Sequence, residues 1–214
     1  MEPEFWHERW AENRIGFHEG ETNAALAAHF DALGLARGAR VFVPLCGKTR
    51  DIAWLLGRGM RVAGAELSDL AVRQLFDEMQ VTPEIAESGP LTLWRGGGAE
   101  IFCGDIFDLE AGALGPVDAV YDRAALVALP AEMRAAYAAH LTRITAAAPQ
   151  LTISFEYDQS AMDGPPFSVP EAEVRRLYGE TFALTPVETH AVPGGFRGGV
   201  AAEQTIWLMR RSEA

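Results

Sequence analysis

The sequence predicts one α/β domain, residues 1–214, with a mostly parallel sheet and helices on both faces. Short apolar runs alternate with stretches of helical periodicity, which is the order of parallel strands joined by right-handed crossovers. The length of 214 residues and the hydrophobic content of 49% allow one large core. Two late strand-like segments around a glycine-rich loop predict one reversed strand near an edge.

Two aromatic-rich helical segments are predicted before the first strand. In the first, residues 4–13, the side chains of Phe5, Trp6 and Trp10 share roughly one face. The second begins after Thr22, a candidate N-cap, and ends at Gly34. Residues 1–34 could cap the core or form a lid, and periodicity alone does not decide between the two.

The stretch from residue 40 to residue 66 is predicted to organise the fold. It contains a buried strand at 41–43, a tight turn around Gly47, a short helix and a second strand that ends on Glu66. Ser68 is the expected cap of the next helix. This order is typical of the first half of a nucleotide-type site in a doubly wound sheet.

The rest of the chain continues the alternation. Residues 83–90 are expected to form a loop, and Ser168, Pro170 and Glu171 have the spacing of a helix start. Residues 91–95 and 100–103 are expected to form either a hairpin or a strand preceded by an edge strand. The other expected elements are strands at 117–121 and 151–156, a helix at 131–148, and an antiparallel pair of strands at 182–190 and 204–209.

The composition excludes several classes of partner. The chain has 18 Lys and Arg against 30 Asp and Glu, a formal charge of −12, which disfavours nucleic acid and anionic membranes. No apolar run approaches the roughly 18 residues of a membrane span, and the acidic N-terminus is no secretory signal. Cys46 and Cys103 fit neither a disulfide framework nor a zinc site, so we expect reduced thiols and a cytoplasmic location. The five histidines lack ligand spacing, so no metal is expected.

Ligands of open α/β sheets bind at the carboxyl ends of the strands. Glu66 ends the second predicted strand, 19 residues after Gly47, where an acid can accept hydrogen bonds from a ribose diol. The turn has one glycine, so the dinucleotide fingerprint is incomplete and a pyrophosphate ligand is disfavoured. Phe42 stands where a P-loop requires glycine, which excludes that motif. A strand–turn–helix with a chance acid remains the alternative.

Three further residues have two interpretations each. Asp105 is placed to accept from an adenine amino group, or it is a turn residue or helix cap. Arg123 follows a buried strand and would bind a carboxylate or other anion, or pair with Asp122 or Glu66. Trp10 taken alone favours core packing over cofactor contact. The chain has no GxSxG elbow and no Ser or Cys paired with a nearby His, so no catalytic residue is predicted.

Longer stretches resemble the thiopurine S-methyltransferase family of S-adenosylmethionine-dependent enzymes, in particular its bacterial members. The matching segments run from residue 5 to residue 179, and the most specific are VPLCGK at 43–48 and YDRAALVAL at 121–129. Thr49 and Arg50 depart from the usual Ser and aliphatic residue, and the loop around Arg197 matches more weakly. The resemblance implies a Rossmann-like class I methyltransferase fold: a mostly parallel seven-stranded sheet with one antiparallel strand and an N-terminal helical lid.

The resemblance also implies functional residues. Glu66 would bind the ribose hydroxyls of S-adenosyl-L-methionine, Arg123 would lie near its methionine end, and Asp105 with Ile106 would border its adenine. The cofactor-binding set is Trp10, Leu45, Gly47, Glu66, Asp105, Ile106 and Arg123. The acceptor pocket would be lined by Phe17, His18, Pro165, Pro166 and Arg197.

The leading hypothesis is a monomeric enzyme that transfers the methyl group of S-adenosyl-L-methionine to thiopurines and other aromatic or heterocyclic thiols, leaving S-adenosyl-L-homocysteine. Such thiols are largely ionised near neutral pH, so the site needs to align the reactants and exclude water more than to supply a base. One alternative keeps the cofactor and takes selenium or tellurium species, halide or thiocyanate. Another is a non-catalytic adenosine-ligand domain or a nicotinamide oxidoreductase, the latter disfavoured by the lone Gly47.

Overall fold

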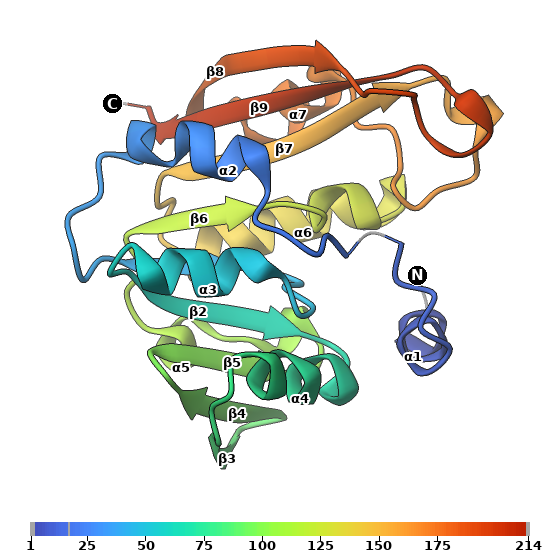
Figure 1. Ribbon diagram of the computed structural model, residues 1–214. Helices are drawn as coiled ribbons and strands as arrows, with labels where there is room; N and C mark the ends of the chain where they lie inside the picture. Colours follow the sequence, from blue (N-terminus) through green and yellow to red (C-terminus); the bar gives the residue numbers. More distant parts are fainter. Residues whose placement is uncertain (1–2, 17, 213–214) are drawn as a thin grey trace.

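One nine-stranded sheet forms the centre of the protein in a computed structural model that describes residues 3–16 and 18–212 (Figure 1). The strand order is β3–β4–β5–β2–β1–β6–β7–β9–β8. Five neighbouring strands are parallel: β5 (Ala99–Cys103), β2 (Arg61–Glu66), β1 (Arg40–Val43), β6 (Ala119–Asp122) and β7 (Gln150–Tyr157).

The flanks of the sheet correct the expected count of seven strands with one reversed. On one side β4 (Leu91–Gly96) runs antiparallel to β5, and β3 (Glu84–Ser88) pairs antiparallel with β4. On the other side β9 (Ala202–Arg211) runs antiparallel to β7, and β8 (Phe182–Ala191) pairs antiparallel with β9. The sheet therefore has nine strands, and two of them, β4 and β9, are reversed. The interpretation of 83–90 as a loop was wrong because β3 is an exposed edge strand without a buried apolar face.

Helices cover both faces, as predicted. α2 (Ala24–His29), α3 (Arg50–Gly57) and α4 (Asp69–Glu78) pack on one face, and α5 (Ala111–Leu114), α6 (Ala131–Ile144) and α7 (Glu171–Tyr178) pack on the other. β1 shows the alternation. Phe42 belongs to the core that includes Tyr137 of α6, whereas Val41 and Val43 pack with Leu55 of α3. Burial on both faces explains why this strand is entirely apolar after Arg40.

The helix starts differ in part from the expected ones. Ser68 caps α4, as predicted, by accepting from the Ala71 amide at 3.3 Å. Asn23 rather than Thr22 caps α2, since its side chain accepts from the amides of Ala25 and Leu26. α7 begins after Pro170, because the Ser168 hydroxyl accepts from the Tyr157 amide instead of capping the helix.

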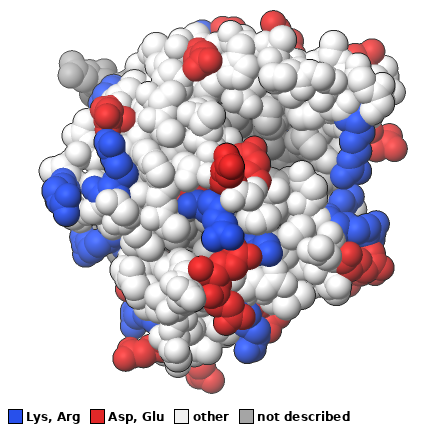
Figure 2. All heavy atoms as spheres, viewed as in Figure 1, with Lys and Arg blue, Asp and Glu red and all other residues white. Residues whose placement is uncertain are grey.

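The N-terminal helix α1 (Pro3–Ala11) lies beyond the carboxyl ends of the parallel strands, apart from the two helical layers (Figure 1). Residues 12–16 and 18–23 lead from it to α2. The rim of the sheet that α1 faces is where ligands of such folds bind. No helix among the described residues is long and apolar enough to cross a membrane. Acidic and basic side chains are interspersed over the face in Figure 2 rather than gathered into separate areas.

Candidate functional site

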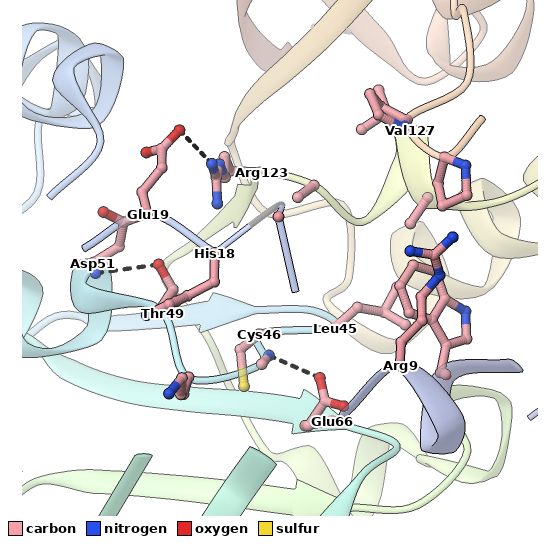
Figure 3. Close-up of a pocket in the computed structure, with 18 of the residues that line it drawn as sticks. Arg9, His18, Glu19, Leu45, Cys46, Thr49, Asp51, Glu66, Arg123 and Val127 are labelled. Carbon is pink, nitrogen blue, oxygen red and sulfur yellow. Dashed lines mark hydrogen bonds and ion pairs between the residues drawn. The ribbon is translucent and has the colours of Figure 1, made fainter. Parts of the chain in front are cut away.

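A cavity of about 400 Å³ opens at the carboxyl ends of β1, β2, β6 and β7. Its walls come from α1, residues 16, 18 and 19, the turn after β1, and the two loops that precede α7 and β9. Figure 3 shows part of this lining. Nine residues predicted from the sequence line it: Trp10, His18, Leu45, Gly47, Glu66, Arg123, Pro165, Pro166 and Arg197.

Three predicted site residues are not among those described as lining the cavity. Asp105 and Ile106 follow β5, the strand beside β2, and do not line it. The Asp105 carboxylate accepts from the Phe107 amide at 2.9 Å and caps the short helix η2 (Ile106–Asp108), which is the helix-cap interpretation of this residue. Ile106 is buried in the core. Phe17 lies outside the described residues.

Glu66 is built into the turn that follows β1. Its Oε2 accepts from the Gly47 amide at 2.7 Å (Figure 3). Its Oε1 accepts from the Ser68 amide at 2.9 Å. Burial raises the pKa of Glu66, and these hydrogen bonds oppose the rise. Each carboxylate oxygen retains acceptor capacity, so Glu66 can also receive hydrogen bonds from hydroxyl groups in the cavity.

The space beside Gly47 is occupied by Trp10. A Cβ atom at Gly47 would lie 3.0 Å from the Trp10 ring, and the φ angle of Gly47 is +52°, a region that favours glycine. Trp10 is 4% exposed, yet its side chain lines the cavity. Trp10 is therefore buried, as the core-packing interpretation held, and it also faces the cavity, whereas its contact with the cofactor stays a prediction.

Arg123 is paired with an acid that sequence reasoning did not consider. Its guanidinium lies 2.5 Å from the Glu19 carboxylate, on the segment between α1 and α2, rather than beside Asp122 or Glu66 (Figure 3). Glu19 also accepts from the Asn23 side chain at 3.1 Å. The carboxylate of Asp122 is buried on the other side of the strand, accepting from the Tyr137 hydroxyl at 2.7 Å, and burial raises its pKa to about 6. Arg123 thus ties the N-terminal segment to the end of β6.

Asp51 is a site residue that the sequence did not reveal. It is 1% exposed, lines the cavity, and accepts from the Asn23 amide at 2.8 Å and the Tyr121 hydroxyl at 3.0 Å. In the sequence it is an acid in the first turn of a helix, a common position with no functional meaning. Only its burial beside Tyr121 distinguishes it, and burial also raises the pKa of that tyrosine.

The far wall of the cavity is apolar. It includes Pro165 and Pro166 of the loop before α7 and Phe196 of the loop before β9. The Phe196 ring meets the rings of Phe155 and Tyr157 edge to face, with centroids 5.1 and 5.5 Å apart. These contacts hold the loop that carries Arg197 against β7.

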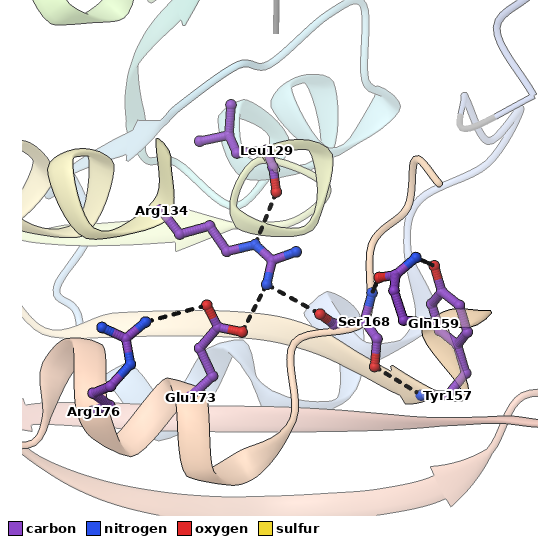
Figure 4. Close-up of polar contacts among 7 residues, drawn as sticks. All are labelled: Leu129, Arg134, Tyr157, Gln159, Ser168, Glu173 and Arg176. Atoms are coloured by element: carbon purple, nitrogen blue, oxygen red, sulfur yellow. Dashed lines mark hydrogen bonds and ion pairs between the residues drawn. The ribbon is translucent and has the colours of Figure 1, made fainter. Parts of the chain in front are cut away.

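A polar network anchors the loop before α7 (Figure 4). Arg134, 3% exposed, donates to the backbone oxygens of Leu129 and Ser168 and pairs with Glu173 at 2.7 Å. The Tyr157 hydroxyl donates to the Pro166 oxygen at 2.6 Å, and Gln159 donates to that hydroxyl. These hydrogen bonds hold the loop that carries Pro165 and Pro166 in place beside the cavity.

The cavity lining also contains residues that the sequence did not single out for the site. Arg9 and Trp6 reach it from α1, and Met162 and Phe155 line the wall near the prolines. The aromatic periodicity of α1 indicated a buried face but gave no reason to assign Arg9 to a site.

Several solved structures with the same architecture are methyltransferases. The 1,6-didemethyltoxoflavin-N1-methyltransferase of Burkholderia thailandensis, with 1,6-didemethyltoxoflavin and S-adenosylhomocysteine bound, matches with a TM-score of 0.65 at 19% identity, over 97% of this chain and 86% of that one. The magnesium protoporphyrin IX methyltransferase of Synechocystis, with S-adenosylmethionine bound, matches with a TM-score of 0.65 at 17% identity, over 98% and 97%. The fold is therefore that of the Rossmann-like S-adenosylmethionine-dependent methyltransferases.

Sequence comparison defines the family within this class. The model of the thiopurine S-methyltransferase family matches residues 1–207, and the chain belongs to that family. The thiopurine S-methyltransferase of Xanthobacter autotrophicus is 58% identical over 99% of this chain and all of that protein. The thiopurine S-methyltransferase of Gluconobacter oxydans is 48% identical over 95% of this chain and 92% of that protein.

Proposed function

We propose that this protein transfers the methyl group of S-adenosyl-L-methionine to the sulfur of thiopurines and other aromatic or heterocyclic thiols. The observation that carries the proposal is one continuous cavity with two different walls. Polar groups of Glu66, the Gly47 turn and Arg123 line one side, and aromatic rings and prolines line the other. An apolar wall of this extent suits a flat ring better than a small inorganic anion.

The residues of the polar side fit S-adenosylmethionine. Glu66 is held at the end of β2 with acceptor capacity for two ribose hydroxyls, and Arg123 offers a cation for the carboxylate of the methionine part. The turn at Gly47 brings Trp10 and Leu45 close without the glycine amides that a pyrophosphate needs. The roles of Asp105 and Ile106 beside the adenine stay predictions.

The chemistry requires little proton transfer from the protein. When bound, S-adenosylmethionine supplies a methyl group on a sulfonium for in-line displacement by the acceptor sulfur. The rings of Trp10, Phe155 and Phe196 restrict water around the reacting groups, which favours a reaction that joins an anion to a cation. His18 lines the cavity with its pKa lowered, chiefly by burial and by Lys48, so it is neutral near pH 7. We propose that it shapes the acceptor pocket together with Pro165 and Pro166.

The N-terminal segment acts as a lid in this proposal. Trp10 packs on the Gly47 turn, and Glu19 pairs with Arg123, so two residues of this segment touch the cofactor side of the cavity. The same segment contributes Trp6 and His18 to the lining. A segment with contacts of this kind can close over both ligands and align them.

Radiolabelled methyl transfer tests the function. The purified protein is incubated with labelled S-adenosylmethionine and either 6-mercaptopurine, thiophenol, selenite reduced by thiol, or thiocyanate, and calorimetry with S-adenosylhomocysteine is run beside it. We expect cofactor-product binding and faster transfer to the two ring thiols. Binding without transfer to ring thiols would refute the acceptor class, and no binding would refute the cofactor.

A further inference from the structure

Two arginines line the cavity without an acidic partner in the described part of the chain. Arg9 extends from α1, and Arg197 begins the short helix η5 (Arg197–Gly199) in the loop before β9. The two Lys and Arg side chains that remain in the described lining each have an acidic partner: Lys48 pairs with Glu78 at 2.9 Å, and Arg123, assigned above to the cofactor side, pairs with Glu19. Arg9 is half-buried and Arg197 is exposed, so both guanidinium groups can offer donors to an anion that enters the cavity.

Arg9 has donors that the protein does not use. Its Nε is buried and has no hydrogen-bond partner, and its Nη1 reaches only the Arg14 backbone oxygen, at 3.5 Å. Its guanidinium is held 4.4 Å from the centre of the Phe5 ring, which leaves the side chain directed at the cavity (Figure 3). The pKa of Arg9 is lowered, chiefly by burial and then by the nearby Arg14 and Arg197.

Arg197 approaches the same region from the opposite wall. Its Nη2 lies 3.6 Å from the position of a Cβ atom on Gly16, so its guanidinium packs against the lid segment that follows α1. The neighbouring Phe196 is anchored on Phe155 and Tyr157, which fixes the base of the side chain. One guanidinium therefore comes from the lid and one from an anchored loop, with the apolar wall of the acceptor side beside them.

We propose that Arg9 and Arg197 together bind an anionic substituent of the methyl acceptor, so that preferred acceptors are aromatic thiols that carry a carboxylate in addition to the thiol. The inference rests on the proposed function, since it names a substrate class for the same cavity. Planar guanidinium groups match the two oxygens of a carboxylate. The thiolate sulfur of the acceptor is one atom and cannot use the donors of two guanidinium groups. It must also lie beside the methyl group of the cofactor, so the arginines bind a different substituent.

The experiment compares two acceptors that differ in one substituent. Values of kcat/KM are measured for 4-mercaptobenzoate and for 4-methylbenzenethiol at saturating S-adenosylmethionine, in the wild type and in the Arg9→Gln, Arg197→Gln and Arg211→Gln variants. Arg211 ends β9 on the surface and serves as the charge-matched control. We expect the wild type to prefer the carboxylate. Loss of either cavity arginine should lower the ratio of kcat/KM for 4-mercaptobenzoate to kcat/KM for 4-methylbenzenethiol about ten- to a hundredfold, and Arg211→Gln should leave that ratio unchanged.

A second measurement is independent of turnover. Calorimetry with 4-(methylthio)benzoate and with its neutral 4-methyl analogue, in the presence of S-adenosylhomocysteine, should show tighter binding of the carboxylate in the wild type and not in Arg9→Gln. The inference would be overturned if the variants lost kcat/KM equally on both acceptors and affinity equally for both thioethers, or if the wild type did not prefer the carboxylate. Methylation of ring thiols would still stand in either case. Failure to methylate any thiol would instead count against the proposed function, and the calorimetry would still decide whether the arginines select a carboxylate.

Discussion

Glu66 serves the fold and the site with the same two oxygens. It joins the turn after β1 to the start of α4 by accepting from Gly47 and Ser68, and it presents that carboxylate to the cavity. Its position after a buried strand was sufficient to predict a ligand role. Its structural role was not visible in the sequence, because the donors are backbone amides and any residue can supply them.

Glu66→Ala should therefore show two defects. We expect weaker S-adenosylhomocysteine binding by about 1–3 kcal/mol and a free energy of unfolding lowered by about the same amount, because the buried Gly47 amide loses its acceptor. Calorimetry and urea unfolding measure the two quantities. Glu87→Ala, on the exposed edge strand β3, is the control and should change neither. Unchanged binding in Glu66→Ala would remove this residue from the cofactor site.

Residue types at strand ends explain what could be predicted and what could not. Glu66 and Arg123 were found because a charged residue directly after a buried apolar run is unusual. Asp51 and Arg9 were missed because each sits in a helix where such residues are ordinary. Glu19, the partner of Arg123, is 104 residues away in the sequence and belongs to a segment without periodicity, so no local pattern indicated the pair.

At the scale of elements, the loop between β7 and α7 is organised by a buried arginine from another helix. Arg134 of α6 joins the Ser168 backbone to Glu173 of α7, and the prolines that line the cavity lie a few residues before Ser168 (Figure 4). Proline and glycine in this stretch predicted an irregular segment and a helix start nearby. The anchor itself depends on α6 packing against α7, which sequence periodicity does not specify.

Arg134→Met should loosen this loop. Removing Arg134 leaves the Ser168 oxygen without this donor and Glu173 with only the exposed Arg176 at 3.4 Å, and we expect the free energy of unfolding to fall by about 3 kcal/mol. The Michaelis constant for the acceptor should rise more than that for the cofactor. Arg176→Met is the matched control, because Arg176 is exposed and lies 3.4 Å from the same Glu173, and it should cost less than about 1 kcal/mol. Equal effects of the two substitutions on unfolding would contradict the anchoring role.

At the scale of the whole molecule, the three layers followed from the alternation of apolar runs and helical stretches. The width of the sheet did not. β3 has no buried residue, and its pairing depends on the β4–β5 hairpin rather than on an apolar pattern of its own. Patterns report burial, so the strands of the centre could be predicted and an exposed edge strand could not.

The global stability should depend on the protonation of Asp122. Its pKa is raised from 3.8 to about 6 by burial, so the folded state binds this proton more tightly than the unfolded state. The resulting stabilisation is fully present below pH 3.8 and is lost as the pH rises through about 6. From pH 5.5 to pH 8 the wild type should lose about 1 kcal/mol relative to Asp122→Asn, which cannot ionise. Urea unfolding of both proteins across this range tests it, and parallel stability curves would show that Asp122 does not titrate there.

The contact between Trp10 and Gly47 has a consequence for exchange of segments between relatives. The indole fills the volume that a side chain at position 47 would need, so the N-terminal helix and the turn after β1 are shaped to each other although 36 residues separate them. A chimera that takes residues 1–34 from one homologue and the sheet from another inherits a working site only if both halves of this contact match. The N-terminal helix and the turn after β1 should therefore change together among homologues, because a substitution on one side of the contact is tolerated only if the other side still fits it.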